Sequence, residues 1–186
     1  MLKKVTPFII DFETLNGRPD GARLRDEVLK RLEGEPADIV LPLDFSKVNG
    51  IDFSFADEML GRIIRRISIG EPGGRYIILE SLSDSVRESI NVALKERELA
   101  CVYVKPNSEI EILGKISEEL KKTYYIAVGK GKITARDILE LENADNISIS
   151  AASNRLTRLK ELSLLIKTND EIVNGGGRQY VYEPIR

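Results

Sequence analysis

The stretch that decides the fold runs from residue 43 to residue 60 and reads Leu43-Asp44-Phe45-Ser46-Lys47-Val48-Asn49-Gly50-Ile51-Asp52-Phe53-Ser54-Phe55-Ala56-Asp57-Glu58-Met59-Leu60. Its first residues end a mostly apolar run, 38–45, which has the length of a strand in a sheet covered on both faces. Asn49-Gly50 then turns the chain. Apolar residues recur at helical spacing from Phe55 to Ile67. The stretch therefore predicts a strand, a tight loop and a helix.

Strand-like and helix-like segments alternate on both sides of this stretch. Further strands are expected at 5–12, 76–79 and 100–104, with a short piece at 109–113, and Pro7 suits an edge or a strand start. Apolar spacing predicts helices from Leu24 to Leu32 and across 83–98, whereas 16–21 is rich in Gly and Pro and predicts a turn. This alternation predicts an α/β fold with a largely parallel sheet over residues 1–114.

The quoted stretch resembles the core of a STAS domain, the fold of sulfate-transporter and anti-sigma-factor-antagonist domains. The family shows a strand ending in Asp-hydrophobic-Ser, a short loop, and an Ile-Asp-Ser-Ser/Thr-Gly run that opens a helix. The match is closer to STAS-like domains of unassigned function, and the run Gly17-Arg18-Pro19-Asp20-Gly21-Ala22-Arg23-Leu24-Arg25 is similar to the same proteins. Those proteins often carry a C-terminal winged helix.

The resemblance implies a phosphorylation or partner site around Asp52 and Ser54. In anti-sigma antagonists, the Ser or Thr that follows the loop Asp is phosphorylated by a partner kinase, and the added charge switches partner binding. Phe53 occupies that acceptor position here and cannot be phosphorylated. Ser54 is one place later, where we expect it to be the N-cap of the helix.

The pattern changes at about Gly114. A helix is expected around 116–124, and a second, at 135–141, follows a capping box formed by Thr134 and Asp137. A third helix begins after the N-cap Ser148, with Ala152, Leu156 and Leu159 on its apolar face. Strands at 164–167 and 179–182 flank a glycine-rich link. Helices followed by a hairpin predict a winged helix-turn-helix domain over residues 115–186.

The run 147–156, with Leu159 and Leu164-Leu165, resembles the recognition helix and first wing strand of winged-helix repressors of the arsenic-repressor kind. Ser163 replaces their usual Gly, and their Cys/His metal ligands are missing. The resemblance implies DNA binding without metal sensing. Base edges are expected near Ser150, Ala151, Asn154 and Arg155, phosphates near Arg158 and Lys160, and a wing contact at Arg178. The expected polar face carries Ala151, Asn154, Arg155 and Arg158.

Composition narrows the classes of function. The 186 residues include no His and one Cys, which excludes His-based catalysis, imidazole zinc sites and a disulfide framework. Adjacent carboxylates such as Asp57/Glu58 are not expected to converge as an acid/base pair, because helical neighbours point about 100° apart. They are expected on a solvated surface. Cys101 is expected to be a buried, inert thiol. We expect neither an enzyme nor a cofactor, and no window has the length and apolar character of a membrane span, so a cytoplasmic protein is expected.

The favoured interpretation is a DNA-binding transcription regulator whose STAS-like domain supplies a protein or dimer contact. Residues 115–186 hold 12 Lys and Arg against 10 Asp and Glu, a net charge of +2. Residues 1–114 therefore carry −4 of the chain's net charge of −2. A homodimer would meet two DNA half-sites about one helical turn apart. The alternative is a partner-switching protein with an ATPase-type kinase as partner, in which the winged helix contacts protein. A third is ligand binding at the sheet edge.

Overall fold

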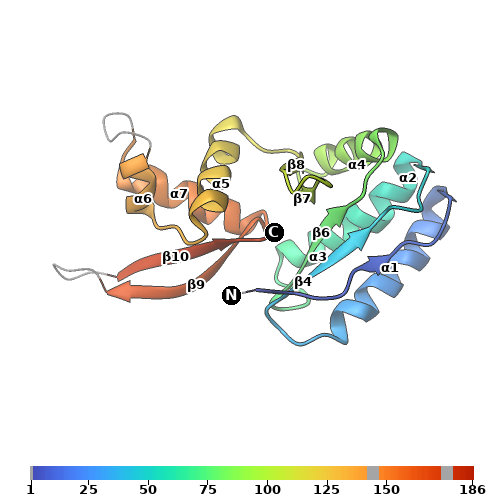
Figure 1. The fold of residues 1–186 in the computed structure, drawn as a ribbon, viewed down its shortest axis with the longest axis horizontal. Helices are drawn as coiled ribbons and strands as arrows, with labels where there is room; N and C mark the ends of the chain where they lie inside the picture. The colour runs from blue at the N-terminus through green and yellow to red at the C-terminus, as the bar shows by residue number, and fades with distance from the viewer. Residues whose placement is uncertain (1, 142–146, 173–177) are drawn as a thin grey trace. The chain divides into compact units, whose positions relative to one another are not determined.

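The computed structural model describes residues 2–141, 147–172 and 178–186 (Figure 1). The chain divides into two compact units, Leu2–Ile116 and Ser117–Ile185, called here the N-terminal unit and the C-terminal unit. The predicted turn at 143–146 and the three glycines at 175–177 lie outside the described residues.

A mixed sheet with helices forms the N-terminal unit. Its elements are β1 (Lys3–Lys4), β2 (Phe8–Ile9), β3 (Thr14–Leu15), α1 (Gly17–Glu33), β4 (Ile39–Asp44), β5 (Gly50–Ile51), α2 (Phe53–Ala56), η1 (Asp57–Gly61), α3 (Arg62–Ser68), β6 (Arg75–Glu80), α4 (Asp84–Glu96), β7 (Ala100–Val104) and β8 (Ile110–Gly114). The strand order is β1-β4-β6-β7-β8, with β2 also paired to β4. Every pair is parallel except β7 with β8. The predicted α/β fold with a largely parallel sheet is confirmed.

The core of this unit lies between the sheet and its helices. Alternate residues of β4, namely Ile39, Leu41 and Leu43, join the core, as the period of a strand requires. The helices α1 and α4 both contact the bent helix made of α2, η1 and α3 (Figure 1). Phe55 and Met59 on this bent helix are fully buried. The expected apolar spacing from Phe55 onward is therefore a core face.

Two expected elements differ from the structure. Of the strand expected at 5–12, only Phe8–Ile9 forms a strand, β2, and Pro7, which has no N–H to donate, lies between it and the earlier β1. The turn expected at 16–21 is wrong, because α1 begins at Gly17. Pro19 is tolerated in the first turn of a helix, where its missing N–H has no intrahelical partner.

Three helices and a hairpin form the C-terminal unit. They are α5 (Glu118–Lys130), α6 (Ala135–Leu141), α7 (Ile149–Glu161), β9 (Leu165–Ile172) and β10 (Arg178–Pro184), the two strands being antiparallel. Ile133, between α5 and α6, forms a bridge with Tyr182 of β10. The buried Tyr124 of α5 donates its hydroxyl hydrogen to the carbonyl of Ile185 at 2.7 Å. These contacts tie the first helix to the end of the chain.

Helix caps in the C-terminal unit agree with the expected ones. Thr134 and Asp137 form the capping box, since the Thr134 N–H donates to Asp137 Oδ2 at 2.7 Å and the Asp137 N–H donates to Thr134 Oγ1 at 3.3 Å. The Ser148 hydroxyl accepts from the Ala151 N–H at 3.2 Å. At its other end, α7 closes with Ser163 in the left-handed region, at φ 56°. Hydrogen bonds from Ser163 to Lys160 and from Leu164 to Leu159 make this end a Schellman motif.

Candidate functional site

Asp52 lies where the starts of α1 and α2 meet. The short parallel pair of β3 and β5 brings Gly17 next to it. Asp52 Oδ2 accepts from the Gly17 N–H at 2.9 Å, and Oδ1 accepts from the Phe55 N–H at 2.7 Å. Gly17 has φ 75°, a conformation in which a side chain would be strained. Asp52 thus caps α2 and fixes the entry of α1.

The expectation that Ser54 caps this helix is wrong. Asp52 is the N-cap and Ser54 lies inside the first turn, half-buried. A carboxylate can accept two hydrogen bonds from two backbone directions at once, which is what this junction requires. Phe53, at the position of the phosphate acceptor in anti-sigma antagonists, is the first residue of α2 and is 43% exposed.

Asp57 and Glu58 are buried, which contradicts their expected place on a solvated surface. Both lie on η1, a π-helical segment of five residues whose members are all buried. Such segments carry one extra residue per turn and are frequent at functional sites. Buried carboxylates need charged partners. Arginines from α1, from α3 and from the end of α4 supply them.

Asp57 is held mainly by Arg97, the C-cap residue of α4. Arg97 donates to both carboxylate oxygens, with Nη2 2.9 Å from Oδ2, and Arg18 Nη2 lies 3.4 Å from the same Oδ2. The hydrogen bonds from Arg97 hold the pKa of Asp57 below its usual value, because they outweigh the effect of burial. The same pairing raises the pKa of Arg97. Asp57 is therefore charged at neutral pH.

Glu58 is shared by three arginines. Arg25 pairs with Oε1, while Arg18 Nη1 and Arg62 Nε lie 3.3 Å and 2.9 Å from Oε2. We call the six residues Arg18, Arg25, Asp57, Glu58, Arg62 and Arg97 the arginine–carboxylate cluster. It carries four positive and two negative charges, and the exposed Asp26 also contacts Arg25.

Two glycines make room for this cluster. A Cβ on Gly21 of α1 would lie 3.0 Å from Glu58 Cβ, and one on Gly61 of η1 would lie 2.6 Å from Arg97 Cδ. Gly21 therefore lets α1 approach η1, and Gly61 leaves the space that the Arg97 side chain fills. Of the contacts in this cluster, the pair of Glu58 with Arg62 has a spacing typical of a helix, four positions. Arg18 and Arg97 each lie 40 positions from their partners, so the sequence does not indicate their contacts.

The expected DNA-contacting residues of α7 differ in their exposure. Ser150, Asn154 and Arg158 are exposed, whereas Ala151 and Arg155 are half-buried. The spacing of an α-helix places all five within an arc of about 140°, with Ala151 and Arg155 on the side nearer the buried Leu159.

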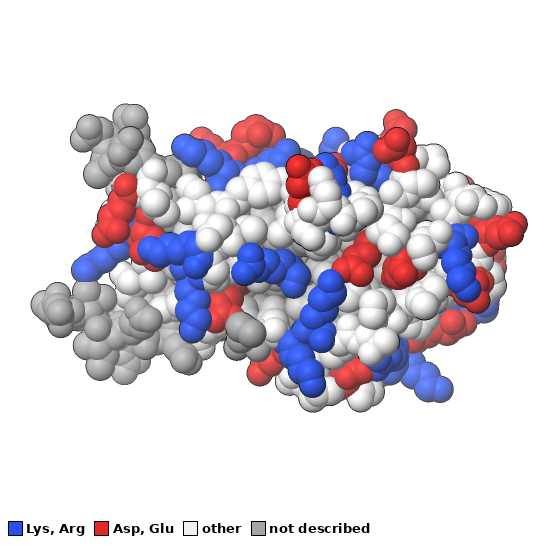
Figure 2. All heavy atoms as spheres, in the orientation of Figure 1, with Lys and Arg blue, Asp and Glu red and all other residues white. Residues whose placement is uncertain are grey.

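The remaining basic residues of this surface have different surroundings. Arg158 Nη1 pairs with Glu161 at 2.9 Å, and Lys160 is exposed. The side chain of Arg178 lies outside the described residues, although its backbone begins β10. On the face drawn in Figure 2, Lys and Arg are interleaved with Asp and Glu.

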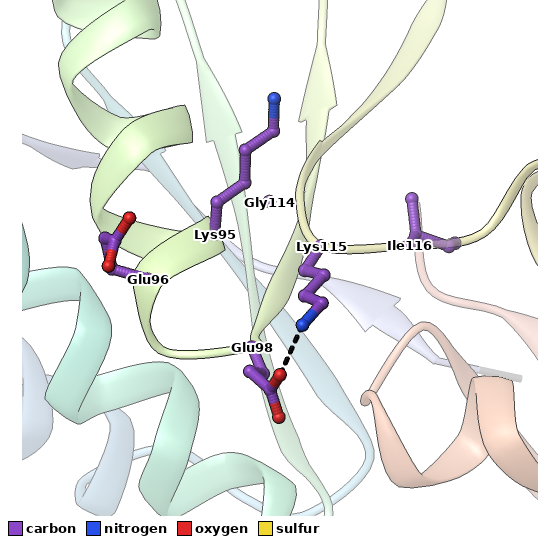
Figure 3. A pocket seen from close by; sticks show the side chains of 6 residues that line it. All are labelled: Lys95, Glu96, Glu98, Gly114, Lys115 and Ile116. Carbon is purple, nitrogen blue, oxygen red and sulfur yellow. Dashed lines mark hydrogen bonds and ion pairs between the residues drawn. The ribbon is translucent and has the colours of Figure 1, made fainter.

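A separate hollow lies at the end of α4 and β8. It is lined by Lys95, Glu96, Glu98, Gly114, Lys115 and Ile116. Figure 3 shows Lys115 reaching Glu98, with which it forms an ion pair, while Lys95 extends the other way. Both charged groups of that pair are mostly exposed, so the hollow lacks the buried polar groups that would fix a ligand.

Comparison with known families bears on the N-terminal unit alone. Residues 20–87 match the STAS-like domain of unknown function (DUF4325). The matched STAS-like region runs from the first turn of α1 to the first turn of α4, and it contains Asp52, Asp57 and Glu58. No curated protein and no solved structure shows significant similarity to the chain.

Membrane-crossing helices and metal sites are both missing from residues 2–141, 147–172 and 178–186. None of the helices there combines the length and the apolar character that a membrane crossing requires. Within the same ranges, His, Cys, Asp and Glu do not gather in groups of three that could hold a metal ion.

Proposed function

We propose that the C-terminal unit is a winged helix-turn-helix that binds duplex DNA, with α7 as recognition helix and the β9–β10 hairpin as wing. The observation that carries this proposal is the bridge between Ile133 and Tyr182. It joins the segment between α5 and α6 to the hairpin, so that the elements follow in the order helix, bridged segment, two helices and hairpin. Helix α6 and helix α7 then form the helix-turn-helix.

The exposed face of α7 has the chemistry for reading DNA. Ser150, Asn154 and Arg158 recur every four residues and are all exposed. An Asn amide can make two hydrogen bonds to adenine, and an Arg guanidinium can make two to guanine. The cap at Ser148 leaves further N–H groups of the first turn available to a phosphate. The opposite face, with Ala152, Leu156 and Leu159, is fully buried and anchors the helix.

In this proposal, the STAS-like unit supplies the protein or dimer contact of a transcription regulator. A homodimer would set two copies of α7 on half-sites about one turn of DNA apart. Regulators of this kind do no chemistry of their own, which agrees with a chain that has no His.

The test is binding of the full chain to a fluorescent duplex library, measured by anisotropy over a range of salt concentrations. We expect Arg155→Ala and Arg158→Ala to weaken binding, and to reduce the salt slope by about one for each phosphate that the arginine neutralises. The control is Arg65→Ala, which removes an exposed arginine of α3 in the other unit. Equal binding by all variants, or none at low salt, would overturn the proposal.

The ion pair between Arg158 and Glu161 allows a test in the opposite direction. Glu161→Gln removes a negative charge next to the proposed DNA surface and releases Arg158 from its partner at 2.9 Å. We expect this variant to bind duplex DNA several-fold more tightly at low salt and to gain less at high salt, because screening weakens the charge effect.

A second candidate function is partner switching with an ATPase-type kinase. Its supporting observation is Phe53, a large apolar side chain left 43% exposed at the start of α2. This candidate predicts that a kinase-like protein copurifies with the wild type and is lost with Phe53→Ala but not with Arg158→Ala. Phosphorylation at Ser54 belongs to the same candidate and would appear as a mass increase of the intact chain, absent from Ser54→Ala.

A further inference from the structure

The arginine–carboxylate cluster holds more positive charge than its two carboxylates need. Arg25 pairs with Glu58 and Arg97 pairs with Asp57, and these two arginines are the less exposed ones, at 21% and 30%. Each buried carboxylate is thus neutralised by one partly buried arginine. Arg18 and Arg62 are therefore in excess of the charge that burial requires.

The two excess arginines are also the two that face solvent. Their side chains are 59% and 51% exposed, yet both guanidinium groups contact the same oxygen, Glu58 Oε2. This shared contact holds two like charges within about 6 Å of each other, and the single negative charge of Glu58, which also pairs with Arg25, offsets only part of their repulsion. Exposed arginines normally avoid such an arrangement because their long side chains are free to separate.

Unused hydrogen-bond donors remain on both groups. A guanidinium has five N–H donors. Arg62 uses Nε for Glu58, and among the described residues its Nη1 and Nη2 have no acceptor. Arg18 uses Nη1 for Glu58 and Nη2 for Asp57. Arg18 is also the second residue of the 17-residue helix α1, so the positive end of the helix dipole adds to the field.

We propose that Arg18 and Arg62 form a binding site for a tetrahedral oxyanion, a phosphate group carrying up to two negative charges. The six residues of the cluster have a surplus of two positive charges, which Asp26 beside Arg25 reduces to one, and a phosphate group carries one to two negative charges. Fixed guanidinium groups suit the oxygens of phosphate better than a mobile ammonium does, because they donate pairs of hydrogen bonds. In this site Asp57 and Glu58 do not touch the anion. They hold the two guanidinium groups in place, so they are positioning residues.

The experiment uses the full chain and two probes, inorganic phosphate and a short phosphoserine peptide, in titration calorimetry at low salt. We expect one saturable site, weakened by about tenfold or more in Arg18→Gln and in Arg62→Gln. The matched control is Arg65→Gln, an exposed arginine one turn along α3 from Arg62, which should change the affinity by less than about twofold. Tighter binding of the peptide would indicate a phosphorylated protein as the source, and equal binding would indicate the free ion.

Two outcomes overturn the proposal. One is no saturable binding of either probe up to about 10 mM. The other is equal weakening by the control, which would indicate a general charge effect. Arg62→Lys is a second variant for the case in which Arg62→Gln does not fold. It keeps the positive charge at this position but lacks the paired N–H donors of a guanidinium. We expect it to bind with an affinity between those of wild type and Arg62→Gln.

Discussion

Replacement of Gly61 by alanine tests whether Arg97 is held where the structure places it. A Cβ at this position would lie 2.6 Å from Arg97 Cδ and 2.7 Å from Nε, closer than such contacts occur. Because the obstruction is in the middle of the side chain, Arg97 must leave and its pair with Asp57 is broken. We expect two opposing effects, the loss of that pair and the gain of a better helix former.

The sizes of these two effects decide whether Gly61→Ala raises or lowers the free energy of unfolding. Breaking a buried pair costs about 3–5 kcal/mol, which we reduce to about 2 kcal/mol because Arg97 is 30% exposed and Arg18 still contacts Asp57. Alanine in place of glycine in a helix contributes about 0.5–1 kcal/mol in the favourable direction. When the gain in helix propensity is subtracted from the cost of the lost pair, Gly61→Ala should lower the free energy of unfolding by about 1–1.5 kcal/mol.

The same substitution should have the opposite sign when Arg97 is already absent. In an Arg97→Ala background nothing obstructs the new methyl group, so Gly61→Ala should stabilise the chain by about 0.5–1 kcal/mol. Gly129→Ala in α5, where an added Cβ meets no atom within 4 Å, is the matched control and should stabilise in both backgrounds.

The measurement is urea unfolding followed by far-UV circular dichroism, since the chain has no Trp. Native-state hydrogen exchange of the β4 amides assigns the change to the N-terminal unit. If Gly61→Ala destabilises equally in both backgrounds, the obstruction does not involve Arg97 and the reasoning fails.

Three further predictions concern single residues. Ser163→Gly should raise the free energy of unfolding by about 0.5–1 kcal/mol in urea, because Ser163 has φ 56° and glycine adopts that conformation at less cost. Burial alone would raise the pKa of Asp137, but hydrogen bonds from Lys130 and Thr134 outweigh it and lower the pKa. Asp137 therefore contributes stability above its unfolded pKa of about 3.9, lost as the pH falls through the lower folded value, and Asp137→Asn should flatten this part of an acid titration. Cys101 is buried and its pKa is raised to about 12, so a thiol reagent at pH 8 should modify it only after unfolding.

Each of these has a contrary outcome. A destabilised Ser163→Gly would mean that the serine side chain contributes more than its backbone strain costs. If Asp137→Asn leaves the acid titration unchanged, the capping box does not contribute to the pH dependence of stability. Rapid modification of the native thiol would show that the strand carrying Cys101 opens locally.

The sequence pattern predicted the strands and helix starts that depend on residues close together in the chain. β4, β6 and β7 are short apolar runs, and Ser83 and Ser148 cap their helices where a hydroxyl precedes an amphipathic stretch. These features depend on residues within one or two turns of each other. The start of α1 was predicted wrongly because glycine and proline favour turns. Both are also tolerated in the first turn of a helix.

The arginine–carboxylate cluster could not be predicted in this way. Asp57 and Glu58 are neighbours on a helix, and most of the contacts that offset the energy of their burial come from distant segments, α1 and the end of α4. The charged residues next to Asp57 and Glu58 in the sequence would be equally compatible with an exposed helix. Gly61, a glycine inside an apolar helical run, is a local sign that another group approaches closely there.

The π-helical segment has a consequence for insertions and deletions. A π-turn accommodates one residue more than the α-helix it interrupts, so residues on its two sides are offset by about 100° from a continuous helical register. Deleting one residue from Asp57–Gly61 would let the bent helix become regular. Phe55 and Ile63 would then lie seven positions apart on a regular helix, so both would still face the core. A deletion in a regular buried α-helix rotates the residues beyond it by about 100°, whereas a deletion within this segment removes its extra residue and leaves the core faces on its two sides aligned.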